Sequence, residues 1–227
     1  MNKLQSFVVE ESDHYSGGMA VDAGSVWLTW GICVNRISFA THAVLASYEL
    51  PEEAAIQAEL GFPALTPCGK LFCVVYNDHG PEEIFVFEAD TLQFLFCFGD
   101  GLLKEVRGMA VGGNELFVAD AGSETIEVFS FSGVWRRTLS GVWRFPSKLC
   151  FMHGRLFMVE NDEYGECPRW GERIFVLTAQ GCVLQVYTHP DEERLEVCLA
   201  YSRSIVAGFD GKLVLAVSNK LIAFTGL

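Results

Sequence analysis

One segment of the sequence, residues 106–141, reads as four short apolar strands separated by three tight turns. The turns carry Gly, Asn, Asp and Ser, which favour turns, and the strands are expected at 108–111, 115–119, 125–131 and 134–139. Four strands joined in this way form an antiparallel meander. A meander of about 35 to 45 residues has the size of one β-propeller blade. The segment therefore predicts an all-β fold built from repeated blades.

The strand-and-turn unit recurs along the chain. The tetrapeptide Gly-Met-Ala-Val occurs at 18–21 and again at 108–111. The first turn of each unit carries a glycine, and these glycines are spaced by 45, 44, 41 and 57 residues: Gly24, Gly69, Gly113, Gly154 and Gly211. Most of these spacings fall within the ~40–50 residues of a propeller blade. The sequence predicts a five-bladed β-propeller in a single domain over 1–227. Six blades are the alternative, but no sixth repeat is found.

The last unit and the N-terminus complement each other. The unit at 204–224 contains three strands, whereas residues 4–10 (LQSFVVE) form a strand pattern that no hairpin follows directly. We expect residues 4–10 to pair as the outermost strand of the last blade and to close the ring, because closure removes exposed sheet edges. One short helix is expected at 51–60, where Pro51 is followed by acidic residues and good helix formers.

Charge and composition exclude several classes of partner. The net charge is −13, and the 16 Lys and Arg residues never cluster beyond Arg136-Arg137. Nucleic acid and anionic membranes both attract basic surfaces, so neither is expected as a partner. No apolar run approaches the ~18 residues of a membrane span, and the N-terminus lacks a signal-peptide pattern. Most of the eight cysteines sit in apolar strand patterns and none forms a CxxC pair. We therefore expect a reduced, cytoplasmic protein.

The best unit resembles the NHL repeat of β-propellers. The resemblance is carried by Leu116-Phe-Val-Ala-Asp120 and Ile126-Glu-Val-Phe129, and more loosely by Leu156-Phe-Met-Val-Glu160. It extends over nearly the whole chain, although Trp30 stands where Asp120 stands in the best copy. The resemblance implies a propeller that binds protein or RNA, selects substrates for a ubiquitin ligase or, in relatives, is a metal-dependent enzyme. The RING and zinc-box segments of such ligases are absent from the sequence.

Candidate site residues follow the second strand of each unit, where loops of a propeller gather around the central channel. They include Trp30, Asp78, Asp120 and Glu160. Oxygen ligands suit a hard cation such as Ca²⁺, which would act as a Lewis acid, and the candidate ligands are Asp78, Asp120 and Glu160. The alternative is turn chemistry without any cofactor, since Asp and Asn end strands by bonding nearby backbone.

The loop at 161–172 is a long insertion where the other units have short turns. Long loops in compact domains are often functional, and Tyr164, Arg169 and Trp170 are residue types enriched at binding hot spots. The alternative is that Trp170 folds back to cover the blade. Trp135 and Trp143 are expected to pack between blades. Acidic loop pairs such as Glu82-Glu83 are expected to be solvated, and they would complement a basic partner.

Two functions remain. The first is a non-enzymatic module whose loop face binds a protein or peptide through the candidate residues Trp30, Asp78, Asp120, Glu160, Tyr164, Arg169 and Trp170. The second is a metal-dependent hydrolase or lactonase similar to gluconolactonase-type propellers. Those relatives carry a Glu on an inner strand among their metal ligands, whereas the expected inner strands here contain neither Glu nor Asp. The binding module is therefore preferred.

Overall fold

The computed structural model describes residues 17–51, 58–77, 81–160 and 173–188, together with the strands at 202–207, 213–217 and 220–224. All regular secondary structure in these residues is β-strand. Among them there is thus no helix that could cross a membrane.

Four sheets share one topology, with four antiparallel strands paired in chain order. Blade 1 holds β1 (Gly18–Val21), β2 (Ser25–Trp30), β3 (Cys33–Ser38) and β4 (Val44–Glu49). Blade 2 holds β5 (Ala58–Leu65), β6 (Lys70–Asn77), β7 (Glu82–Glu88) and β8 (Phe94–Leu103). Blade 3 holds β9 (Val106–Gly112), β10 (Glu115–Asp120), β11 (Thr125–Ser130) and β12 (Trp135–Leu139). Blade 4 holds β13 (Pro146–Met152), β14 (Arg155–Glu160), β15 (Arg173–Thr178) and β16 (Val183–Thr188).

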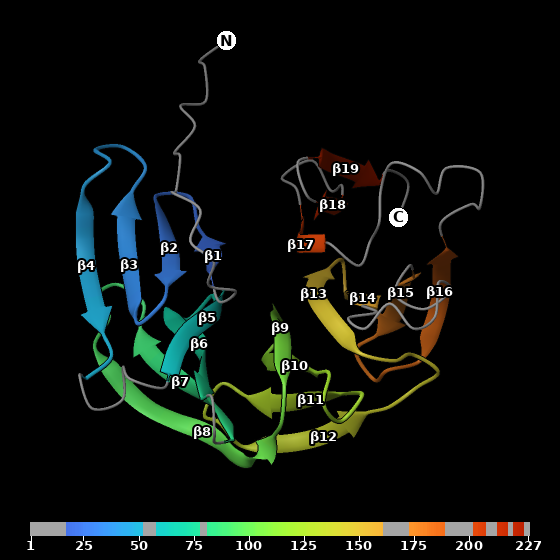
Figure 1. Ribbon diagram of the computed structural model, residues 1–227. Helices are drawn as coiled ribbons and strands as arrows, with labels where there is room; N and C mark the ends of the chain where they lie inside the picture. The colour runs from blue at the N-terminus through green and yellow to red at the C-terminus, as the bar shows by residue number, and fades with distance from the viewer. Residues whose placement is uncertain are drawn as a thin grey trace.

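A last sheet of three described strands follows, β17 (Ser202–Ala207), β18 (Leu213–Val217) and β19 (Lys220–Phe224). The first strands of successive sheets contact one another, from β1 through β5, β9 and β13 to β17. Figure 1 shows the sheets in an arc, with β4, β8, β12 and β16 on the outside. This arrangement confirms the predicted β-propeller architecture. The ring is not closed within the described residues, and the expected closing strand at 4–10 lies outside them.

The hydrophobic core consists of layers between neighbouring blades. The second strands β6, β10 and β14 each contribute side chains to the two layers on either side of their blade. In β10, Leu116 and Val118 are buried against blade 2, whereas Phe117 and Ala119 are buried against blade 4. The same alternation holds in β6 and β14. Because both faces of these strands are buried, they read as continuous apolar runs rather than as an alternating pattern. Complete burial of one Val, Leu or Phe side chain contributes about 1.5–3 kcal/mol to the free energy of unfolding.

Glycine allows the first strands to approach closely. A Cβ atom on Gly18 would lie 2.6 Å from the Cδ atom of Pro63 in β5. A Cβ atom on Gly108 would overlap the carbonyl oxygen of Ser147 in β13. Both glycines open the repeated Gly-Met-Ala-Val tetrapeptide, so this repeat includes a position where two backbones meet.

The pairing of the third and fourth strands has one irregularity that blades 1–4 share, and blade 2 has a second one at Glu82/Ile84. The register shifts at Arg36/Ile37, Val86/Phe87, Val128/Phe129 and Val176/Leu177. In each case the fourth strand gains one residue, which is the definition of a β-bulge. The outer edge of all four blades therefore carries the same irregularity.

Two local predictions are wrong. The expected helix at 51–60 fails at its end, because β5 starts at Ala58 and pairs with β6; residues 52–57 lie outside the described part of the chain. Burial of Ala58 and Leu60 in the core outweighs helix propensity here. Trp135 is half exposed on β12 and donates its indole N–H to Glu127, instead of packing between blades. Trp143 is buried between blades as expected.

We expect Gly108→Ala to lower the free energy of unfolding by about 1–3 kcal/mol, because the added methyl group must displace the β13 backbone. The matched control is Gly17→Ala, whose Cβ would meet the Thr29 carbonyl oxygen at an ordinary contact distance of 3.6 Å. That change should stay within about 0.5 kcal/mol. Urea unfolding of both variants measures the difference. Equal stabilities would contradict the close approach of β9 and β13.

Candidate functional site on the linker face

One end of the blades collects two kinds of connection. The turn from the second to the third strand and the linker that enters the next blade lie side by side there. At the β2–β3 turn of blade 1, the carbonyl oxygen of Ile32 accepts the backbone N–H of Leu50, and that of Gly31 accepts the backbone N–H of Leu60 in blade 2. In blade 3, Ala121 donates its backbone N–H to the carbonyl oxygen of Glu105. We call this end, with residues 30–32, 102–105, 121–124 and 142–144, the linker face.

Asp120 ends β10 and holds the linker into blade 3. Its side chain is fully buried. Oδ1 accepts the backbone N–H of Glu105 at 2.9 Å, and Oδ2 accepts that of Lys104 at 3.2 Å. The hydroxyl of Ser123 donates to Oδ2 at 2.6 Å. The carboxylate therefore ties the incoming linker to the β10–β11 turn.

Glu160 ends β14 and plays the same part for blade 4. It is fully buried, and Oε1 accepts the backbone N–H of Arg144 at 2.7 Å. Arg173 at the start of β15 pairs with it through two N–H groups, with Nε–Oε2 at 2.6 Å and Nη2–Oε1 at 2.5 Å. Two-pronged, charge-assisted bonds of this kind fix geometry strongly. Blades 3 and 4 thus use one device at equivalent positions.

These contacts bear on the expected Ca²⁺ site. Asp120 and Glu160 belong to different blades, and each uses its oxygen atoms on local donors. Within the described ranges no group of three or more His, Cys, Asp or Glu side chains is placed to hold an ion. Asp78 lies outside those ranges, as do Tyr164, Arg169 and Trp170. Both carboxylates accept backbone N–H groups of the incoming linkers, and the Ca²⁺ site stays a prediction.

Trp30 occupies the position in blade 1 that Asp120 occupies in blade 3. Both are the last residue of a second strand, one residue beyond the partner of Gly18 or of Gly108. The Trp30 side chain is 42% exposed. Two further apolar side chains on the linker face are also exposed, Leu102 (41%) and Val142 (72%). The linker face therefore combines fixed backbone with solvent-accessible apolar groups.

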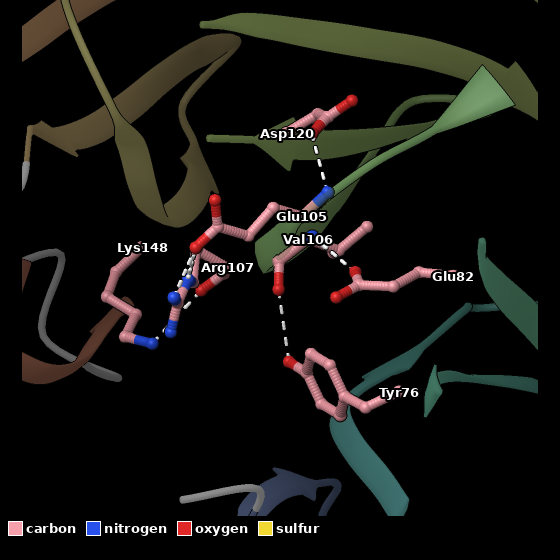
Figure 2. Close-up of polar contacts among 7 residues, drawn as sticks. All are labelled: Tyr76, Glu82, Glu105, Val106, Arg107, Asp120 and Lys148. Carbon is pink, nitrogen blue, oxygen red and sulfur yellow. Dashed lines mark hydrogen bonds and ion pairs between the residues drawn. The ribbon is translucent and has the colours of Figure 1, made fainter. Parts of the chain in front are cut away.

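Figure 2 shows a second set of polar contacts, where blade 2 meets blade 3. Glu82 at the start of β7 accepts the backbone N–H of Val106 with Oε2. The Tyr76 hydroxyl donates to the carbonyl oxygen of the same residue at 3.1 Å. The first residue of β9 is therefore held at both of its polar groups by blade 2. Beside it, Arg107 pairs with Glu105, and Lys148 donates to the Arg107 carbonyl oxygen at 3.0 Å.

Glu82 was expected to be solvated, and this is wrong, because the side chain is only 8% exposed. It lies in β7, opposite Leu103 of β8, rather than in a loop. Burial raises the pKa of its carboxyl group to about 7; the Val106 hydrogen bond and Arg107 lower it, and Asp120 and Glu105 raise it. Burial and the nearby Glu82 raise the pKa of Tyr76 well above its ordinary value, so its hydroxyl stays a neutral donor.

Sequence reasoning located some of these groups and missed others. It placed Trp30, Asp120 and Glu160 at the ends of second strands, where they are found. It missed Tyr76 and Glu82, which bind the backbone of Val106, 30 and 24 residues further along the chain. A signal existed for Val142, an apolar residue that follows Ser140-Gly141 in a linker where polar residues are typical.

No protein-family model matches the sequence, and no curated protein matches it. Similar solved structures exist. The WD40 β-propeller domain of Doa1 shares 14% identity with a TM-score of 0.64, over 90% of this chain and 61% of that one. A chain of a nidogen/laminin complex shares 16% identity with a TM-score of 0.60, over 78% and 64%. The Myxococcus xanthus glutaminyl cyclase shares 11% identity with a TM-score of 0.61, over 92% and 91%.

At these identities the likeness shows the fold alone, and it confirms the β-propeller. The chain spans less than two thirds of the length of the Doa1 domain that it matches. The predicted NHL repeat stays a prediction, since no family model matches. The fold is therefore established, whereas the similar proteins range from complex components to an enzyme.

We expect Asp120→Ala to lower the free energy of unfolding by about 3 kcal/mol, because the N–H groups of Lys104 and Glu105 lose their buried acceptor. Chemical denaturation measures the change. The exposed carboxylate of Glu49 provides the control, and Glu49→Ala should stay within about 0.5 kcal/mol. A wild-type melting temperature that Ca²⁺ raises, with no response in Asp120→Ala, would instead reveal a bound ion.

We expect stability to fall as the pH rises from about 4.5 to about 7, because folded Glu82 keeps a proton that the unfolded chain releases. Glu82→Gln keeps an acceptor for Val106 but cannot ionise. It should flatten this slope and exceed the wild type at pH 8 by an amount on the order of 2 kcal/mol. Tyr76→Phe, which removes the other contact to Val106, should lower stability without altering the slope. Thermal unfolding across pH 4–8 tests this, and parallel wild-type and Glu82→Gln profiles would refute it.

Proposed function

We propose that this chain is a protein- or peptide-binding β-propeller that uses its linker face. The observation that carries the proposal is the exposure of Trp30, Leu102 and Val142 on that face. Exposed aromatic and aliphatic side chains on a fixed scaffold supply the apolar contacts on which interface affinity depends. Trp30 stands where Asp120 stands in blade 3 but has no carboxylate with which to hold a linker.

The linkers beside these side chains are held in advance of binding. Asp120 fixes residues 104–105, and Glu160 fixes Arg144 next to Val142. Arg173 also donates to the Val142 carbonyl oxygen at 3.4 Å. A surface that loses little conformational entropy on binding gains affinity from the same contacts. The buried carboxylates therefore support binding by fixing the backbone and do not themselves contact the partner.

The chemistry of the partner follows from charge and from the exposed groups. A net charge of −13 attracts basic molecules and raises their rate of encounter. A basic segment with apolar or aromatic side chains would satisfy both the charge and the exposed apolar groups. The fold neighbours support a binding role at a coarse level, since one is a chain of a nidogen/laminin complex.

The glutaminyl cyclase neighbour raises the alternative of an enzyme. An enzymatic function needs a group of chemically competent side chains, and the part of the chain that the structure describes holds no group of three or more potential metal ligands.

We also propose that the propeller has five blades. The last sheet supports this count, because β17 contacts β13 as each first strand contacts the one before it.

Peptides selected from a random library on the folded protein should lose affinity at least about tenfold with Trp30→Ala and with Val142→Asp. The reason is that both changes remove apolar contact area from the linker face. Val183→Asp is the matched control, since Val183 is exposed on the outer strand β16. Calorimetric titration of the selected peptides measures the affinities. Peptides that tolerate both linker-face changes but fail on Val183→Asp would refute the proposed surface.

A further inference from the structure

A buried carboxylate lies in the middle of strand β11 of blade 3. Glu127 is only 5% exposed. Its Oε1 accepts the hydroxyl of Thr125 at 2.9 Å, and its Oε2 accepts the hydroxyl of Thr138 at 2.7 Å and the indole N–H of Trp135 at 2.8 Å. All three donors are neutral groups. Within the described part of the chain, no lysine or arginine forms an ion pair with Glu127.

The other blades show what this position can hold. Glu127 lies two residues before Phe129, which pairs with Trp135 at the bulge that blades 1–4 share. Counted from the same bulge, the corresponding residues of blades 1, 2 and 4 are Asn35, Phe85 and Phe175. The two phenylalanines pack in the apolar layers between blades. Among blades 1–4, blade 3 is thus the one that places an acidic residue here.

The tryptophan bound to Glu127 also differs from its counterpart in blade 2. The residue at the position of Trp135 is Phe94 there, and its ring centroid lies 5.0 Å from that of Phe85. In blade 3 this contact between two rings is replaced by a contact between an indole and a carboxylate. Trp135 is 50% exposed. Because Glu127 already uses the indole N–H, a ligand at Trp135 would meet the ring and not a hydrogen-bond donor.

The two arginines that follow Trp135 act on the other side of the blade. Arg137 belongs to the side toward blade 4. It binds Glu115 through two N–H groups, at 2.6 and 2.7 Å. These bonds lower the pKa of the Glu115 carboxyl group, and the charge of Arg136 lowers it further. Trp135 belongs to the side toward blade 2, because its partner Phe129 packs there.

A second buried carboxylate lies on the same side of blade 3. The hydroxyl oxygens of Thr125 and Ser123 are 2.8 Å apart, and Ser123 donates to Asp120 at 2.6 Å. The other donors to Asp120 are backbone N–H groups, which are neutral as well. The side of blade 3 that carries Trp135 therefore holds two carboxylates, Asp120 and Glu127, that are bound by neutral donors.

We propose that Trp135 and Glu127 form a binding site for an organic cation of the alkylammonium class, such as the end of a lysine side chain. The face of a tryptophan ring attracts cations more strongly than that of any other aromatic side chain. An indole that donates its N–H to a carboxylate gains electron density in its ring, which increases this attraction. The carboxylates of Glu127 and Asp120 add a Coulombic attraction. The net charge of −13 also raises the local concentration of cations.

Two probes of the same shape separate the effect of charge from that of apolar contact. Choline carries a quaternary ammonium group, and 3,3-dimethyl-1-butanol is its neutral isostere. Protein labelled with ¹⁵N-tryptophan is titrated with each probe at constant ionic strength, and the indole N–H signal of Trp135 is assigned from its loss in Trp135→Phe. Choline should shift this signal with an affinity at least about threefold above that of the alcohol. An equal response to both probes, or no response, would overturn the proposal.

Blade 2 supplies the matched control. Phe94→Trp places an indole at the equivalent position, beside Phe85 and without a carboxylate. The new indole signal should respond equally to choline and to the alcohol, because it lacks the negative charge beneath the ring. If this indole prefers choline as strongly as Trp135 does, the preference is a property of any exposed tryptophan and the proposed site is refuted.

Glu127→Gln tests the carboxylate itself. Glutamine can still accept the indole N–H, so the affinity for choline should fall about threefold or more while that for the alcohol stays the same. An unchanged affinity for choline in the folded variant would remove Glu127 from the site. If the variant does not fold, the comparison with Phe94→Trp decides alone. These titrations involve neither Trp30 nor Val142, so they test this site independently of the linker face.

Discussion

The structure depends on one packing constraint, which is that a sheet buried on both faces needs a neighbour on each side. The second strands show this most clearly. Phe117 and Ala119 contact one neighbouring blade, while Leu116 and Val118 contact the other. Among the residues that the structure describes, no blade has a core of its own, so the stability of each blade depends on the blades beside it. The glycines of the first strands and the buried carboxylates help to keep neighbouring sheets at the correct distance.

The buried carboxylates are one such device. Asp120 and Glu160 hold the linkers that enter blades 3 and 4, and Glu82 holds the first residue of β9 from the blade before it. A buried charge is costly unless donors surround it, and backbone N–H groups at a chain entry need acceptors. The carboxylate supplies the acceptor that the N–H groups need, and the N–H groups supply the donors that the carboxylate needs. A carboxylate at the end of a second strand therefore has a structural role whether or not it binds a ligand.

Local signals in the sequence were enough to predict the strands and turns of the blades. Gly69, Gly113 and Gly154 adopt positive φ in the turns where they were predicted, because glycine tolerates that conformation. Contacts distant in sequence were beyond such reasoning. Ala58 and Leu60 follow a helical pattern but pair with β6, and Glu82 accepts the backbone N–H of Val106, 24 residues later. For the same reason the positions of Asp120 and Glu160 were predictable, whereas the groups that they bind were not.

The bulge shared by the outer strands affects how readily the edge of a blade can pair with another chain. The outermost strand of a blade presents unpaired N–H and C=O groups, and β8 adds the exposed side chains of Phe94 and Leu95. Such an edge is a template on which another chain can polymerise. The extra residue at Val86/Phe87 and its three counterparts bends the edge and interrupts its regular spacing. Each of blades 1–4 therefore carries the same bulge, which disfavours edge-to-edge association with another chain.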